Sequence, residues 1–127
     1  MNKEKTLNNH IVTPELIEMF KNYPLYSQDD KKTDAMCVAL FHIGNIRWYM
    51  LEGSVENDDF IFFGIVLGLQ ETEYGYHSAN EMANIAYDAS MYGLNTIHIE
   101  RVKSFEPCKL RDIKDNELQS FLSRIYS

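Results

Sequence analysis

Ten consecutive residues, Phe60 to Leu69, carry no polar side chain, and mostly acidic polar residues surround them at 56–59 and 70–73. A run this short, rich in aromatic and β-branched residues, is typical of a strand that is buried on both faces. Because side chains alternate along a strand, Gly64 and Gly68 fall on one face with larger apolar residues. Two glycines on one face leave space for a helix or a large ring to approach. We therefore predict a central strand with a groove on one face.

Three other segments predict strands. Ala35 to Ile43 and Ile46 to Gly53 are rich in apolar residues, and the Gly44-Asn45 pair between them is typical of a tight hairpin. A short acidic link then leads to the central strand, which indicates an antiparallel meander of three strands. A fourth strand is predicted at 95–103, where apolar and polar residues alternate.

Apolar spacing and capping signals predict three helices. They start at Thr13, Ser78 and Asp115, whose side-chain oxygens can accept hydrogen bonds from the free N–H groups of a first helical turn. The second helix is expected to end near residues 91–92, with Gly93 as its C-terminal cap. These elements predict an α+β fold: a four-stranded, mostly antiparallel sheet with about three helices packed on it.

The length suits a single domain over residues 1–127. Residues 1–12 form a polar lead-in that is expected to be flexible and lacks the apolar centre of a signal peptide. No apolar run reaches the roughly 18 residues that cross a bilayer, so no membrane association is predicted. Cys37 and Cys108, far apart in the chain, give neither a metal spacing nor a disulfide framework. We therefore expect a reduced, cytoplasmic setting.

The net charge is −7, and it is unevenly distributed. No Lys or Arg occurs between Arg47 and Arg101, an interval that holds nine acidic residues. Direct nucleic-acid binding by this region is disfavoured, because neutralising phosphates requires cations. Two interpretations stay open: a solvated acidic surface that aids solubility, or an acidic face that competes for a basic groove on a partner protein. In the second interpretation, the binding residues are Glu52, Glu56, Asp58, Asp59, Glu71 and Glu73.

The residues that could carry catalysis or hold a metal lack the spacing that either requires. The histidines occur in unrelated segments without the spacing of a metal motif, at His10, His42, His77 and His98. His77 and Ser78 are neighbours, but adjacent side chains point too far apart to act as a base and a nucleophile. Cys108 lies in a basic segment and could be a reactive thiol, but the sequence places no base beside it. No catalytic residue, metal or cofactor is therefore predicted.

One group of residues suggests a binding pocket. Two tyrosines and a histidine precede the second helix, and a Glu-Arg pair lies in the returning strand. A helix N-terminus beside aromatic side chains and a charged pair could bind a small anion or a peptide carboxylate. Alternatively, the aromatics form a rim and the charged residues a surface pair worth under about 1 kcal/mol. The pocket residues are Trp48, Tyr74, Tyr76, His77, Glu100 and Arg101.

Several stretches, taken in order, resemble a known family. They are Thr-Pro-Glu-Leu-Ile with Pro-Leu-Tyr-Ser, Trp48 to Gly53, Asp59 to Gly64, Glu73 to Tyr76, and Ile99 to Arg101. Their order and spacing over residues 13–107 are similar to domain-of-unknown-function family 2958, bacterial proteins common on plasmids, phages and other mobile elements. The chain departs from the family at His77 and Ala79, where the family usually reads Phe and Leu, and residues 108–127 look like a C-terminal helical extension. The resemblance implies a bacterial or mobile-element origin and no particular activity.

Two functional hypotheses follow. The first is a non-enzymatic protein-interaction domain of a bacterial mobile element or phage. Its specific form is an anti-defence inhibitor, of the anti-CRISPR or anti-restriction type, that occupies the nucleic-acid-binding groove of a host protein. The alternative is a small-molecule or peptide-binding domain, or a minor enzyme, that uses the pocket. The first predicts binding that weakens as salt rises. The second predicts a concave pocket with a perturbed titratable group at the start of the second helix.

Overall fold

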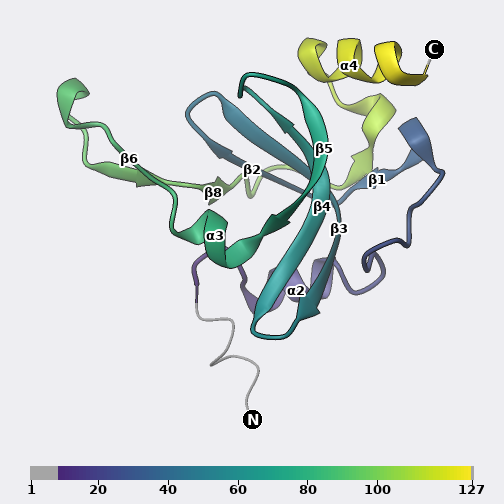
Figure 1. Ribbon diagram of the computed structural model, residues 1–127, viewed down its shortest axis with the longest axis horizontal. Helices are drawn as coiled ribbons and strands as arrows, with labels where there is room; N and C mark the ends of the chain where they lie inside the picture. The colour runs from purple at the N-terminus through teal and green to yellow at the C-terminus, as the bar shows by residue number, and fades with distance from the viewer. Residues whose placement is uncertain (1–8, 127) are drawn as a thin grey trace.

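The computed structural model describes residues 9–126, which form an α+β fold (Figure 1). The main sheet has five antiparallel strands in the order β5–β4–β3–β2–β8. The predicted class is confirmed, but the predicted four strands are five. Residues 73–78, expected to lead into a helix, pair with β4 as an edge strand. The strands are β2 (Ala39–Ile43), β3 (Ile46–Glu56), β4 (Asp59–Leu67), β5 (Glu73–Ser78) and β8 (Glu100–Arg101).

Helices and two short ladders surround this sheet. The ladder of β6 (Ala86–Asp88) with β7 (Thr96–His98) forms an arm that projects from the sheet on the side away from α4 (Figure 1). The helices are α2 (Pro14–Met19), α3 (Ala79–Ala83) and α4 (Asn116–Tyr126), and the 3-10 turns are η1 (Lys32–Asp34), η2 (Ser90–Tyr92) and η3 (Leu110–Asp112). The first ladder joins β1 (Met36–Cys37) to β9 (Cys108–Lys109), and the second joins β6 (Ala86–Asp88) to β7 (Thr96–His98).

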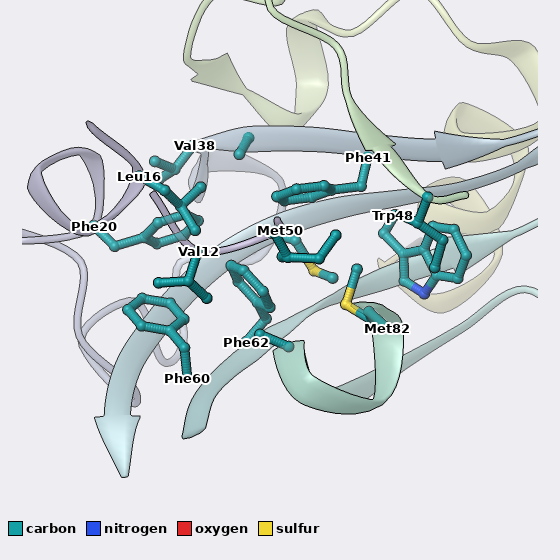
Figure 2. Close-up of a cluster of buried hydrophobic side chains, with 14 of the residues drawn as sticks. Val12, Leu16, Phe20, Val38, Phe41, Trp48, Met50, Phe60, Phe62 and Met82 are labelled. Atoms are coloured by element: carbon teal, nitrogen blue, oxygen red, sulfur yellow. The ribbon is translucent and has the colours of Figure 1, made fainter. Parts of the chain in front are cut away.

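The two faces of the main sheet bury separate cores, because side chains alternate along each strand. Leu16 of α2 and Met82 of α3 cover one face, where they pack with Trp48 and Phe62 of the sheet (Figure 2). The helix α4 covers the other face. That second core includes Tyr49, Leu51, Ile65, Leu67, Leu118, Phe121 and Leu122.

The space beside Gly64 is filled by backbone rather than by a helix or a ring. Strand β3 has a bulge between Met50 and Glu52 where it pairs with β4. A Cβ added to Gly64 would clash with the carbonyl oxygen of Tyr49 and lie 2.8 Å from the Cα of Met50. Gly68 lies beyond the end of β4, with a left-handed φ of +92°. The predicted groove was therefore wrong: one glycine permits close contact between strands and the other permits a turn.

The second predicted helix is much shorter than expected. Ser78 caps α3 as predicted, and its Oγ accepts a hydrogen bond from a first-turn N–H at 3.1 Å. The helix does not continue to residues 91–92, because the following segment pairs as β6 with β7. Tyr87 and Ile97, an aromatic and a β-branched residue, face each other in that ladder. The strand predicted at 95–103 accordingly divides between β7 in the arm and β8 in the main sheet.

Residues 9–12, which belong to the segment predicted to be flexible, pack against the fold through the buried Ile11 and Val12 side chains. The Oδ1 atom of Asn9 accepts hydrogen bonds from the N–H groups of Ile11 at 3.0 Å and Val12 at 2.9 Å. Both apolar side chains join the first core. The flexibility of the lead-in stays a prediction, and the first eight residues lie outside the described part of the chain.

Asp115 caps α4 as predicted, and it also joins that helix to the sheet. Its Oδ1 accepts a hydrogen bond from the N–H of Leu118 at 3.2 Å. Its Oδ2 lies 2.7 Å from the Nε of Arg47 and accepts a hydrogen bond of 2.7 Å from the Tyr49 hydroxyl. Hydrogen bonding from Arg47, supported by Tyr49, lowers the pKa of Asp115 to about 2 even though desolvation opposes the shift.

We expect Asp115→Asn to lower the free energy of unfolding and to make that free energy less dependent on pH in the acidic range. The helix cap survives, because Asn is also a good N-cap, but the charge-assisted bond to Arg47 is lost. The pKa of Asp115 lies below its ordinary value of 3.8, so its contribution is present above about pH 4 and is lost as the pH falls towards about 2. Solvent screening limits the loss to about 1 kcal/mol. Urea unfolding at neutral and acidic pH tests this; the same acid dependence in both proteins would contradict it.

Candidate functional site

Glu52, predicted to belong to an acidic binding face, is buried and only 2% exposed. Its carboxylate accepts hydrogen bonds from the backbone N–H groups of Tyr26 at 2.7 Å and Gln28 at 2.8 Å. This side chain therefore holds the loop that follows α2, and its carboxylate faces that loop rather than a partner. Sequence reasoning grouped Glu52 with surface acids and missed this role.

The other five predicted acids divide between the two ends of β4. Glu56, Asp58 and Asp59 lie at the turn between β3 and β4, and Asp59 accepts a hydrogen bond from the first turn of α3 at 3.0 Å. Glu71 and Glu73 lie between β4 and β5 or at the start of β5, at the opposite end of a strand that is about 30 Å long. These acids do not converge on one face, and partner binding by either group stays a prediction.

The loop at 24–35, between α2 and β1, is built on buried polar side chains. Gln28 is 5% exposed, and its Nε2 donates to the carbonyl oxygens of Met36 and Leu51 at 2.8 Å each. Its Oε1 accepts a hydrogen bond from the N–H of Met36 at 2.6 Å. Gln28 and Glu52 therefore fix the loop to β1 and β3 from the inside, because each is paired with backbone groups.

Three non-glycine residues of this loop have a left-handed backbone. Their φ angles are 74° at Tyr26, 68° at Asp30 and 53° at Lys32. Such conformations are disfavoured by about 1–2 kcal/mol per residue, so the contacts of Gln28 and Glu52 must hold them in place. Tyr26 itself is 62% exposed. Strain of this kind concentrates at binding and catalytic sites, which marks the loop as a candidate site.

A row of aromatic side chains runs from this loop across the sheet to α4. The Tyr26 ring lies 6.3 Å from that of Tyr76, which lies 5.0 Å from Phe63. Phe63 stacks on Tyr74 at 5.5 Å, and the hydroxyl groups of Tyr74 and Tyr126 are hydrogen-bonded at 2.9 Å. A hollow of about 380 Å³ lies between the loop and the Phe63, Tyr74 and Tyr126 side chains.

Acidic side chains accompany the exposed end of this row. We define the tyrosine–acid surface as Tyr26, Asp29, Asp30 and Tyr76, all of which are exposed. A hydrogen bond to Tyr26 is the main cause that raises the pKa of Tyr76, and the charges of Glu52 and Asp29 add to it. Only the smaller contributions of Glu52 and Asp29 to this shift reflect nearby negative charge. The surface therefore combines aromatic faces with a potential that favours cations.

No sequence pattern singles out this loop as a site. Residues 25–33 read as a plain polar loop, since Asp29-Asp30 and Lys31-Lys32 follow one another as in a solvated turn. Tyr26 and Tyr76 are 50 positions apart, and no spacing rule connects them.

The residues of the predicted pocket do not come together. Tyr74, Tyr76 and His77 belong to β5 at one edge of the main sheet. Glu100 and Arg101 belong to β8 at the opposite edge. Three strands separate the two groups, so the aromatic residues and the charged pair cannot bind one small ligand together.

Two members of that pocket, Trp48 and His77, have buried side-chain atoms. Trp48 is 5% exposed and belongs to the first core (Figure 2). The Nε2 atom of His77 is buried, and it has no hydrogen-bond partner among the described residues. Burial lowers the pKa of His77. A perturbed titratable group is thus present at the start of α3, as the pocket hypothesis predicts, but the Glu-Arg pair is not beside it.

Glu100 and Arg101 instead line a cleft of about 450 Å³ with His10, His98 and Glu15. The rings of His10 and His98 meet edge to face with their centres 5.9 Å apart. Arg101 forms an ion pair with Glu15 at 2.8 Å. Since the two histidines are 88 positions apart and the first was expected to be flexible, no local pattern could have placed them together.

The two cysteines face one another across the β1–β9 ladder, but neither thiol is activated. Burial raises the pKa of Cys37. Desolvation and the charge of Asp112 raise the pKa of Cys108, which disfavours the nucleophilic thiolate. Among residues 9–126, no group of three or more His, Cys, Asp or Glu side chains is placed to hold a metal ion. No helix in the described part of the chain is long and apolar enough to span a bilayer.

Comparisons with known proteins supply no relative. No protein-family model, curated protein or solved structure matches this chain. The resemblance to domain-of-unknown-function family 2958 therefore stays a prediction.

Proposed function

We propose that this chain is a non-enzymatic protein-interaction domain that binds a basic segment of a partner protein through the tyrosine–acid surface. The observation that carries the proposal is the strained loop at 24–35, which Glu52 and Gln28 hold so that Tyr26 lies exposed beside Tyr76. Rigidly held tyrosines bury much area on binding and lose little side-chain entropy, so they often dominate interface energies. Fixing the loop in advance also reduces the entropy lost on association.

The acids beside the tyrosines favour a cationic partner group. Asp29 and Asp30 line the hollow behind the tyrosine–acid surface. An Arg or Lys side chain that enters there would meet aromatic faces and carboxylates together, through cation–π and charge-assisted contacts. Lys32 lines the same hollow and offsets part of this negative charge, and Lys31 precedes it in the loop. We therefore expect short-range attraction that rising salt weakens but does not abolish.

The specific form of the proposal is an anti-defence inhibitor of a bacterial mobile element or phage. Such an inhibitor would occupy the nucleic-acid-binding groove of a host protein in the cytoplasm. Those grooves are lined by Lys and Arg, which is the chemistry that the tyrosine–acid surface fits, and a net charge of −7 favours the encounter. The bacterial setting rests on the family resemblance, whereas the preference for a basic partner rests on the surface itself.

We expect the double variant Tyr26→Ala/Tyr76→Ala to weaken partner binding by about tenfold or more, because both aromatic anchors are removed. Wild-type and variant chains serve as baits in a bacterial lysate, and the proteins eluted by a salt gradient are identified and titrated. The control is Tyr92→Ala, which removes a tyrosine that is 70% exposed on the arm. A basic protein captured by the wild type and the control, but not by the double variant, supports the proposal. Equal capture by all three, or no capture, contradicts it.

A second candidate function is the binding of a small zwitterion, such as an amino acid, in the cleft beside β8. The observation that favours it is a mixed lining in which two imidazoles, two acids and two bases meet. Titration of free amino acids, followed by the NMR signals of His10 and His98, tests this function. Unchanged signals at saturating ligand would exclude it. The charged and imidazole residues concerned are His10, Glu15, His98, Glu100, Arg101 and Lys103.

A further inference from the structure

Exposed apolar side chains gather on the arm formed by β6 and β7. Figure 1 shows this arm projecting from the main sheet on the side away from α4. Residues 85–97 include a single charged residue, Asp88. Apolar side chains in contiguous exposed groups commonly mark an interaction site. Those on the arm, with their exposed fractions, are Ile85 (44%), Tyr87 (50%), Met91 (89%), Tyr92 (70%) and Leu94 (58%).

The tip of the arm is a hydrogen-bonded turn. The N–H groups of Tyr92 and Leu94 both donate to the carbonyl oxygen of Ala89, at 3.0 and 3.2 Å. Gly93 adopts the left-handed φ of +73° that the turn requires, and Ala89 is buried beneath it. A hydrogen-bonded backbone therefore presents Met91 and its two large neighbours to solvent in a defined arrangement.

An apolar groove of about 380 Å³ lies at the root of the same arm. Ile43 and Ile46 line it from the β2–β3 turn, and Ile85, Tyr87 and Ile97 line it from the arm. None of the described residues that line it is charged. The arm tip lies about 15 Å further along the extended strand, so an arm cannot fill its own groove.

We propose that a second copy of this chain occupies the groove. The tip of each arm enters the groove of the other copy, and a two-fold axis relates the two molecules. Each molecule carries both a projecting apolar tip and an apolar groove at the arm root, as a closed reciprocal contact requires. The dimer lies beyond the partner binding proposed above and does not depend on it.

Charge and area both suit this occupant. Two copies with a net charge of −7 repel one another over most of their surface, but contact through the arm and groove brings few like charges together. Reciprocal insertion of two arms, each with five large exposed apolar side chains, buries on the order of 1,000 Å². That area is near the lower limit for a specific interface. The dimer is therefore reversible rather than permanent.

Sedimentation velocity of the full chain over a dilution series tests the proposal. We expect an equilibrium between monomer and dimer that tightens as salt rises, because screening weakens the repulsion between acidic molecules. Binding of a basic partner changes in the opposite direction with salt, so failure of one proposal is distinguishable from failure of the other. A monomer at every concentration would overturn the dimer, and so would open-ended assembly.

Paired variants identify the contact. Met91→Ser/Tyr92→Ser removes the tip, and Ala86→Glu places a charge in the groove at an exposed position. Each should weaken dimerisation by about thirtyfold. Leu69→Ser, which changes a residue that is 53% exposed outside the arm, should leave it unchanged. Circular dichroism confirms that each variant is folded.

Mixing the tip variant with the groove variant gives a further test. The mixture should recover part of the association, since one tip and one groove in each mixed pair are intact. If Ala86→Glu dimerises like the wild type, the tips contact each other and the groove is not occupied. If mixing restores nothing, arm exchange is likewise overturned.

Discussion

Gly64→Ala is expected to lower the free energy of unfolding by about 3–4 kcal/mol. Gly64 lies in β4, with β3 and β5 on either side, and the bulge in β3 brings backbone into the space where a side chain would be. An added Cβ would clash with the Tyr49 carbonyl oxygen and lie 2.8 Å from the Met50 Cα. Backbone in the middle of a sheet cannot move aside without losing ladder hydrogen bonds. The loss is large relative to a typical domain stability of about 5–15 kcal/mol.

Gly75→Ala is the matched control, because Gly75 is the direct cross-strand partner of Gly64. A Cβ added to Gly75 meets only the ring of His77, at an ordinary contact distance of 3.6 Å. We expect Gly75→Ala to change the free energy of unfolding by less than about 1 kcal/mol. Alanine lowers the conformational entropy of the unfolded chain, which favours the folded state. Urea unfolding of both variants measures the difference. Similar losses in the two would contradict the close approach of β3 to β4 as the reason for glycine at position 64.

Glu52→Ala is expected to cost about 3 kcal/mol and to release the loop at 24–35. The buried N–H group of Gln28 and the partly buried N–H group of Tyr26 would both lose a charged acceptor. Once unpaired, Tyr26 and Asp30 have little reason to keep a left-handed backbone. Partner binding should weaken as well, because the tyrosine–acid surface would no longer be held in advance.

Urea unfolding and amide hydrogen exchange test this expectation together. Exchange should accelerate within 24–35 and change little in the central strands, because the loop can open locally. Glu52→Gln should be intermediate, since one amide oxygen can still accept one of the two hydrogen bonds. Glu56→Ala, which removes an exposed acid from the same strand, should change stability by less than about 0.5 kcal/mol. Equal effects at 52 and 56 would show that the buried carboxylate does not hold the loop.

The fold was predictable where short-range rules acted without competition. The apolar run of β4, the β2–β3 hairpin and the Ser78 and Asp115 caps were all read from neighbouring residues, and the structure confirms them. The segment after α3 satisfied two patterns at once: helical spacing of apolar residues, and β-forming residues on both sides of Gly93. The segment forms a strand because β6 pairs with β7. This pairing involves residues on the far side of Gly93, so the local spacing of apolar residues does not predict it.

The candidate site was less predictable than the fold. The acids were visible in the sequence, but Glu52 faces inward to a loop while Glu56, on the same strand, is exposed. Glu100 and Arg101 were expected beside Tyr76, yet they lie across the sheet in a cleft with His10. Sequence spacing does not report which edge of a sheet a strand joins, so residues on different strands could not be assigned to one surface.

The sequence by itself determined the α+β class, the central apolar strand, the hairpin and the helix caps, because periodicity and capping act over a few neighbouring residues. Only the tertiary structure decided that Tyr26 lies beside Tyr76 and that β6 and β7 form an arm with an apolar groove at its root. Those features depend on which distant segments bury each other's backbone and side chains. That choice is made by the free energy of the whole fold, and no local pattern contains it.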